Sequence, residues 1–170
     1  MKDRISKGYW IWAQFDSVSM KRYNKIYKIC NNKLNGPLFE IHMTLSGPLL
    51  SNKYIKQKFY LLKNKLKCIE LKPIDYKYSN EFYKSLYIDV KLNKELMDLK
   101  FFIDKWFGIS TINYEPHISI YYGNKEFKEK QEMIEKLPRI PLTSFLSKLC
   151  LVYVNENKNQ WKIIEKFKIL

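Results

Sequence analysis

The spacing of apolar and polar residues predicts strands that alternate with helices along most of the chain. Apolar runs bounded by Gly, Pro, Asp or Asn predict seven strands, at 8–15, 38–46, 67–74, 84–91, 116–122, 146–154 and 160–167. Apolar residues that recur every three or four positions predict four helices, from a cap at Asp16 or Ser17 to the turn residues 31–37, from Ser51 to Leu66, from Asn93 to Gly108, and over 125–137.

This order of elements predicts a mixed α+β fold. In two places one strand follows another without a helix between them, so a doubly wound parallel sheet is excluded. The chain divides into two similar halves, and each half contains one strand with a histidine. Its 170 residues include only 6 Pro and 5 Gly and no low-complexity linker. We therefore expect residues 1–170 to form a single domain.

Composition narrows the class of protein. Hydrophobic residues make up 46% of the chain and aromatic residues 16%, enough for a folded core. No apolar run has the length of a membrane span or follows the N-terminal charges as a signal peptide would. The three cysteines are far apart and form no CxxC pair, which argues against a zinc site or a disulfide framework. We expect a cytoplasmic monomer with no membrane association.

The net charge of +14 has two interpretations. Such a charge attracts polyanions and phosphorylated ligands. However, the chain has only three arginines among its 31 basic residues and is rich in Asn, Ile, Tyr and Phe, the profile that an AT-rich genome gives to any solvated surface. The charge by itself favours neither interpretation.

The chain has only two histidines, and both occur in the same local pattern. The strands that carry them read IHMTL and PHISI, in each case histidine, apolar residue, hydroxyl residue, apolar residue. Residues i and i+2 of a strand share a face, so Thr44 lies beside His42 and Ser119 beside His117, while the apolar residues point into the core. Ser and Thr account for 14 of the 170 residues, so two matches are a stronger signal than one.

These residue types suit the hydrolysis of a phosphodiester. One neutral and one protonated histidine can act as general base and general acid near neutral pH. The hydroxyls of Thr44 and Ser119 can donate to phosphate oxygens as charge develops. The sequence has no compact Asp/Glu/His cluster of the two-metal type, so we expect no metal and no other cofactor. Our hypothesis is that His42 activates water and His117 protonates the leaving oxygen, although the reverse fits equally well.

At these residues the sequence resembles the two-histidine phosphoesterase superfamily, and most of all the cyclic phosphodiesterases of plants and yeast. The resemblance is carried by HMTLSG at 42–47 and PHISIYYG at 116–123, with the polar helix 125–136 and the opening WIWA at 10–13. It extends over most of the chain in length and element order, but it is specific only at the two motifs and their flanks.

The resemblance implies a bilobed fold in which two antiparallel sheets with outer helices are related by a pseudo-twofold axis around a central cleft. It implies hydrolysis of a 2′,3′-cyclic nucleotide or of ADP-ribose 1″,2″-cyclic phosphate to a monophosphate, with nucleotides, oligonucleotides or RNA ends that carry a cyclic phosphate as substrates. It places Tyr122 and Trp12 near the base or phosphate, and Trp10 shares a strand face with Trp12. The alternatives are a surface role for Tyr122 and core packing for Trp12.

Two departures from the family leave the substrate open. Tyr121 stands where an aliphatic residue is common, and the scarcity of arginine means that lysine, a point charge, would have to bind phosphate. A phosphodiesterase or nuclease that degrades oligonucleotide messengers, such as 2′-5′ oligoadenylates or cyclic oligonucleotides, is therefore an alternative, which a deeper and more basic cleft would favour. A non-catalytic RNA-binding module is a third possibility, against which the intact motif pairs argue.

Overall fold

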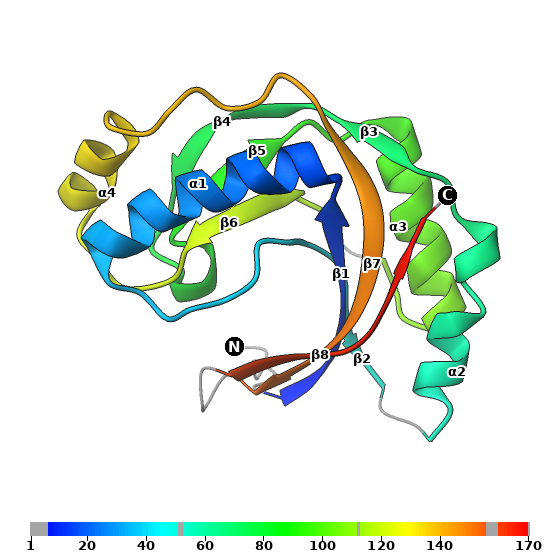
Figure 1. Ribbon diagram of the computed structural model, residues 1–170. Coiled ribbons are helices and arrows are strands. Elements are labelled where there is room, and N and C mark those ends of the chain that lie inside the picture. Colours follow the sequence, from blue (N-terminus) through cyan, green and yellow to red (C-terminus); the bar gives the residue numbers. More distant parts are fainter. Residues whose placement is uncertain (1–6, 51–52, 112, 156–159, 170) are drawn as a thin grey trace.

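The computed structural model describes residues 7–50, 53–111, 113–155 and 160–169 and confirms the α+β class (Figure 1). The strands are β1 (Lys7–Phe15), β2 (Met43–Leu49), β3 (Ile69–Leu71), β4 (Pro73–Tyr78), β5 (Leu86–Val90), β6 (His117–Tyr121), β7 (Ser144–Asn155) and β8 (Gln160–Lys168). The helices are α1 (Ser17–Leu34), α2 (Ile55–Tyr60), α3 (Lys94–Phe107) and α4 (Phe127–Ile134), with short 3₁₀ turns η1 (Lys63–Lys65) and η2 (Phe82–Lys84). Within these ranges no helix has the length and apolar character needed to cross a bilayer.

The described strands form one antiparallel sheet instead of the two that we expected. Its order is β3-β7-β1-β2-β6-β5-β4, and β8 pairs with β7. The two histidine strands, β2 and β6, lie side by side, and the pair Met43–Ile118 joins them. The sheet is therefore continuous, but its two halves meet over a very short contact at its centre. The pseudo-twofold axis stays a prediction.

The sheet is strongly curved because β3 and β4, which stand at the two ends of the main strand order, are neighbours in sequence. One predicted strand, 67–74, is in fact two: Ile69–Leu71 pairs with β7, and β4, which starts at Pro73, pairs with β5. Only Lys72 separates them, although they lie at opposite ends of the strand order. The sheet must bend until its edges meet at this residue (Figure 1).

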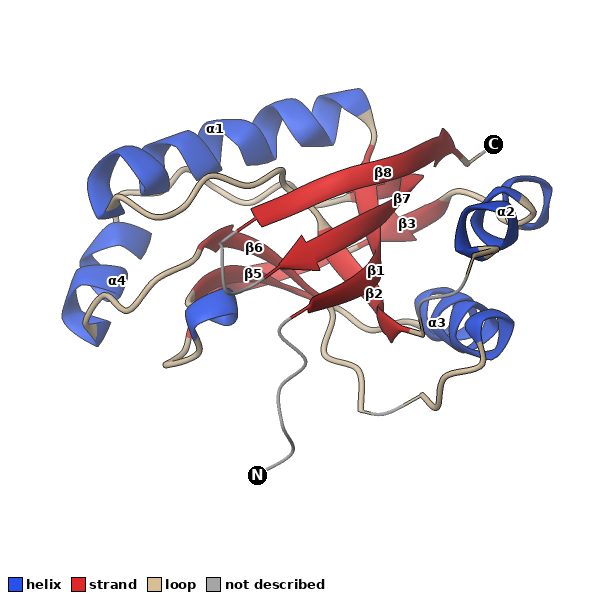
Figure 2. Cartoon of the chain, turned by 90° about the horizontal axis from the view of Figure 1, so that it is seen from below, coloured by secondary structure: helices blue, strands red, loops and turns tan. Residues whose placement is uncertain are grey.

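The helices pack on different parts of this curved sheet. Helix α1 contacts β6 and β1, and α4 contacts β4, whereas α3 contacts β2 and β3. Figures 1 and 2 show α1 and α4 on the side of β4, β5 and β6, and α2 and α3 together on the other side. One cluster of buried apolar residues contains side chains from both halves of the sheet. Each half therefore packs one face against the core, and its other face can contribute side chains to a site.

Local signals set the helix ends as the sequence predicts. The Asp16 carboxylate accepts hydrogen bonds from the amides of Val18 and Ser19 at the start of α1, and the Asn93 side chain accepts from the amide of the third residue of α3. Gly108 ends α3 with a φ of 73°, a left-handed conformation that glycine adopts without steric cost. The predicted cap Ser51 lies outside the described residues.

The predicted strand 38–46 is wrong at both ends. Strand β2 begins at Met43, opposite Ala13, and continues to Leu49, opposite Tyr9. Irregular register between β1 and β2 accommodates the Gly-Pro pair that we expected to end the strand. His42 therefore lies just before β2, where the chain enters the sheet.

Candidate active site

The position of the two motifs follows from the pairing of Met43 with Ile118. These residues face each other across the antiparallel strands β2 and β6, and both are buried, as are Leu45 and Ile120. Alternation along a strand turns the neighbouring residues to the opposite face. The apolar positions of both motifs thus anchor the strands in the core, as the sequence predicts, and their polar positions share the other face.

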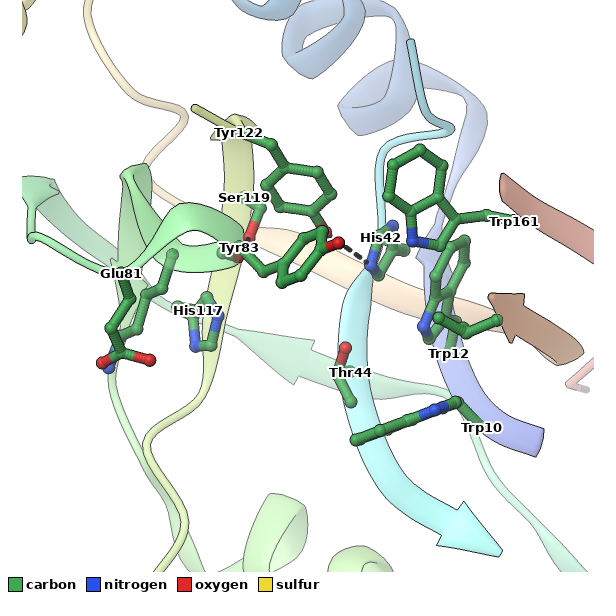
Figure 3. A pocket seen from close by; sticks show the side chains of 12 residues that line it. Trp10, Trp12, His42, Thr44, Glu81, Tyr83, His117, Ser119, Tyr122 and Trp161 are labelled. Atoms are coloured by element: carbon green, nitrogen blue, oxygen red, sulfur yellow. Dashed lines mark hydrogen bonds between the residues drawn. The ribbon is translucent and has the colours of Figure 1, made fainter. Parts of the chain in front are cut away.

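On that face the four motif residues come together. Continued by one residue in each direction, the Met43–Ile118 register puts His42 across from Ser119 and Thr44 across from His117. All four side chains line one cavity of about 440 Å³ (Figure 3), a size that suits a small-molecule ligand. Each histidine therefore has a hydroxyl beside it on its own strand and another on the facing strand.

His42 is enclosed by aromatic rings. Trp12 stacks on it with ring centroids 3.4 Å apart and planes 5° from parallel, and the Tyr122 hydroxyl lies 3.4 Å from its Nε2 atom. Its Nδ1 is 2.6 Å from the backbone carbonyl of Glu40. With only 3% of the residue exposed, burial lowers the pKa of His42 to about 3, against the opposing effect of that hydrogen bond. The ring is neutral at physiological pH.

His117 has more polar surroundings. Its Nδ1 lies 2.8 Å from the backbone carbonyl of Glu115, and Tyr87 packs edge-on at 5.3 Å between ring centroids. Burial lowers the pKa of His117, and the ammonium group of Lys84 acts in the same direction. The carbonyl hydrogen bond and the carboxylates of Glu81 and Glu115 raise the pKa and so oppose that shift. Of the two histidines, His117 is therefore the one whose neighbours include carboxylates that favour its protonated form.

Both histidines are held in the same way. In each case Nδ1 meets the backbone carbonyl of the residue two positions earlier. A carbonyl only accepts, so Nδ1 carries the proton and donates it, which fixes the neutral tautomer. Nε2 is then the atom with a lone pair in the neutral ring and with an N–H in the protonated ring. In His42 this atom is the one that meets the Tyr122 hydroxyl in the cavity (Figure 3).

The two hydroxyl residues are positioned by their backbone neighbours. The Ser119 hydroxyl donates to the carbonyl of Tyr83 at 3.3 Å, a long bond that is easily exchanged for a ligand. The Thr44 carbonyl accepts from the Tyr114 hydroxyl at 3.0 Å, which fixes the strand while the side chain points into the cavity (Figure 3).

Comparison with known proteins agrees with this geometry. No protein-family model matches the chain. A cyclic phosphodiesterase of Arabidopsis thaliana is 25% identical over 130 residues, which are 75% of this chain and 72% of that protein. The fold is similar to E. coli LigT complexed with 3′-AMP, at a TM-score of 0.64 and 10% identity over 96% of this chain and 98% of that one. The protein TT0787 of Thermus thermophilus has a TM-score of 0.59 at 12% identity over 95% and 97% of the chains.

In sequence the chain is thus similar to a cyclic phosphodiesterase, and in fold it is similar to LigT and TT0787. Within the described residues, no group of three or more His, Cys, Asp or Glu side chains is arranged to hold a metal ion.

The three aromatic residues expected at the site all line this cavity. They are Trp10, Trp12 and Tyr122. Tyr122 is buried rather than a surface residue. Trp12 has two roles, because it also packs in a small core cluster with Cys150, Val152 and Val154. Contact of these aromatics with substrate stays a prediction.

Sequence reasoning missed the residues that close the other sides of the cavity. Glu81, Tyr83 and Lys84 come from the segment around η2, and Val154 and Trp161 come from β7 and β8. No motif marked them, because they reach the site only through the curvature of the sheet. Lys84 is the lysine in this lining. Because arginine is scarce in the chain, the sequence predicted that a lysine would have to bind the phosphate.

The missed aromatics Tyr83 and Trp161 form an aromatic wall of the cavity together with Tyr122. The ring of Tyr122 lies 5.3 Å from Tyr83 and 5.7 Å from Trp161 between centroids, and it stacks on Phe39 at 4.0 Å. Planar bases stack on such side chains. The cavity therefore combines an aromatic wall with two histidines, two hydroxyls and one lysine.

Proposed function

We propose that this protein is a phosphodiesterase of the two-histidine phosphoesterase superfamily and that it opens the 2′,3′-cyclic phosphate of a nucleotide to give a monophosphate. The observation that carries the proposal is the convergence of two histidines and two hydroxyls in one cavity with an aromatic wall. The similarly folded LigT is complexed with 3′-AMP, the kind of monophosphate that this ring opening produces. ADP-ribose 1″,2″-cyclic phosphate presents the same strained ring and is the second substrate to test.

Hydrolysis begins at His42. Its Nε2 lone pair accepts a proton from a water molecule, whose oxygen bonds to phosphorus as the bond to one ribose oxygen breaks. The Tyr122 hydroxyl, 3.4 Å from Nε2, orients the base. Because burial keeps His42 neutral, its lone pair is available throughout the physiological pH range.

His117 completes the reaction on the other strand. Its protonated Nε2 donates a proton to the departing ribose oxygen, so one hydroxyl and one phosphomonoester result. The hydroxyls of Thr44 and Ser119, with the Lys84 ammonium group, donate to the phosphate oxygens that gain charge in the transition state. Both histidines then exchange protons with water and return to their starting states. The contrast in surroundings favours this assignment over the reverse one that the sequence left open.

The first prediction tests this chemistry directly. With EDTA present, 2′,3′-cyclic AMP, ADP-ribose 1″,2″-cyclic phosphate and a 2′-5′-linked oligoadenylate are incubated with the protein and the products are separated. We expect turnover of a cyclic phosphate, lowered at least about 100-fold in His42→Ala and in His117→Ala. Thr44→Val should also slow the reaction, whereas Thr143→Val, at an exposed threonine, should not.

Each outcome is informative. If neither histidine variant loses activity, the acid–base roles are wrong even if the substrate is right. Turnover of the oligoadenylate alone would keep the chemistry and replace the cyclic mononucleotide with an oligonucleotide as substrate.

A further inference from the structure

A second cavity adjoins the first on the far side of His117. It also measures about 440 Å³, and both cavities are lined by His117 and Lys84. A cyclic mononucleotide needs only the first cavity, because the leaving oxygen stays on the same ribose as the phosphate. The second cavity is therefore available for a part of the substrate that a mononucleotide lacks.

The sheet register builds this second cavity from the same face as the motif residues. Ser119 on β6 lies opposite Tyr87 on β5, and Tyr87 lies opposite Lys77 on β4. Residues paired across antiparallel strands share a face, so hydroxyl, aromatic ring and lysine form one row. With strands about 4.8 Å apart, this row runs about 10 Å outward from Ser119, which is on the scale of one further nucleotide.

The row offers the chemistry that a nucleotide needs. Tyr87 is partly exposed, and the Lys84 Nζ atom lies 5.1 Å from the centre of its ring. Ile74 and Leu92 also line the cavity, and their side chains, which are 55% and 41% exposed, give it apolar surface that a ligand can contact. An aromatic ring flanked by apolar groups and by lysines can take both a base and a phosphate.

The lysines of the second cavity are held by replaceable partners. Lys77 pairs with Asp89 and Lys84 with Glu115, each at 2.5 Å, while Lys91 also lines the cavity and is exposed. One partner in each pair is more than half exposed, at 52% for the Lys77 side chain and 77% for that of Glu115. Solvent-exposed ion pairs of this kind contribute little to stability, so a phosphate group of the ligand can replace the carboxylates as partners of the lysines.

We propose that the second cavity binds the adjoining nucleotide of an oligonucleotide whose terminal phosphate lies between His42 and His117. The placement of that phosphate rests on the function proposed above. The enzyme then prefers oligonucleotide ends to free cyclic mononucleotides, and Tyr87 and Lys77 determine that preference.

The experiment compares the affinity of the intact protein for 3′-AMP and for a 3′-phosphorylated diadenylate by titration calorimetry. Neither ligand has a cyclic phosphate to hydrolyse. Stacking of one additional base predicts that the diadenylate binds about 5- to 150-fold more tightly. Tyr87→Ala and Lys77→Ala should each lower this ratio, and Tyr87→Phe, which keeps the ring, should preserve it.

Two control variants test whether the loss of any exposed tyrosine or lysine, rather than of one in the second cavity, changes the affinity ratio. Tyr60→Ala removes an exposed tyrosine from α2, and Lys94→Ala removes a lysine that pairs with an aspartate on α3, as Lys77 does on the sheet. Both should leave the ratio unchanged.

Equal affinity for the two ligands in the wild-type protein overturns the proposal, and so does a ratio that Tyr87→Ala and Lys77→Ala leave intact. Lys77 is exposed, so its variant remains informative if Tyr87→Ala folds poorly. Failure of the proposed function looks different: 2′,3′-cyclic AMP is not hydrolysed, while the affinity ratio and its loss in the variants persist.

Discussion

At the scale of single residues, two histidines with the same local motif have different surroundings. His42 is stacked under Trp12 and buried, whereas His117 lies near the carboxylates of Glu81 and Glu115. Both pKa values are lowered, but only His117 has acidic groups that oppose the shift through their charge. The motif supplies two imidazoles, and the difference in their neighbours is the basis for the proposed roles of His42 as base and His117 as acid.

The second prediction concerns the pH dependence of the reaction. Because His117 acts in its protonated form, kcat/KM should fall as the pH rises through its pKa. The Glu81 carboxylate raises that pKa, so Glu81→Gln should move the falling limb to lower pH. Glu132→Gln, at an exposed position of α4, should leave the profile in place. A limb that stays fixed or moves upward in Glu81→Gln would contradict the role of His117 as the acid.

The third prediction concerns acid stability. Burial holds the pKa of His42 at about 3 in the folded protein, against an ordinary value of 6.5. Between these values the unfolded chain binds more protons, so folded stability falls as the pH is lowered through this window. The slope contributed is at most about 1.4 kcal/mol per pH unit. Thermal unfolding from pH 7 to about pH 4 should show a shallower decline in His42→Asn than in the wild type; parallel curves would exclude this contribution.

At the scale of elements, α3 supports the strand that carries Thr44. The buried Asp104 carboxylate accepts hydrogen bonds from Ser46 on β2, at 2.5 Å, and from Thr111 at 2.6 Å. Lys100, one helical turn before Asp104, pairs with the same carboxylate at 2.5 Å. This network fixes β2 directly behind the cavity, so α3 has a share in positioning the site although none of its residues lines it.

The fourth prediction compares two ion pairs of α3 with identical spacing. Lys100–Asp104 is buried, whereas Lys94–Asp98 is exposed at both side chains. Lys100→Met leaves a buried carboxylate without its cation and should cost about 3–5 kcal/mol of unfolding free energy. Lys94→Met should leave stability nearly unchanged. Urea denaturation measures both; similar losses in the two variants would show that the network around Asp104 does not depend on its charge pair.

At the scale of the whole molecule, curvature and charge act together. The sheet bends until its edge strands meet at Lys72, which brings segments of β7, β8 and η2 to the two histidine strands. The chain as a whole carries a net charge of +14. The field of a strongly charged protein can raise the rate at which oppositely charged ligands arrive, and an anionic substrate would gain from this before it makes any specific contact.

The fifth prediction tests whether that charge serves function. If it steers an anionic substrate, kcat/KM for the cyclic phosphate should fall several-fold between about 0.01 M and about 0.15 M salt, as the screening length shrinks from about 30 Å to about 8 Å. The unfolding temperature, measured in the same buffers, controls for loss of folded protein. A flat salt profile would favour the other interpretation, in which the lysines reflect composition alone.

The sequence by itself determined the features that depend only on residues close together in the chain. Alternation along a strand placed each hydroxyl beside its histidine and sent the intervening apolar residues into the core, and side-chain caps placed the starts of α1 and α3. These features depend on neighbours a few residues away, so a single sequence contains them.

Only the tertiary structure decided the rest. The Met43–Ile118 pair, the single curved sheet, the start of β2 and the arrival of Lys84 and Trp161 at the cavity all depend on contacts between distant segments. The proton affinities of the histidines depend on burial and on nearby charges, which no local pattern specifies. The motifs alone thus indicated the reaction, while the curved sheet determined which groups surround it and how far the binding surface extends.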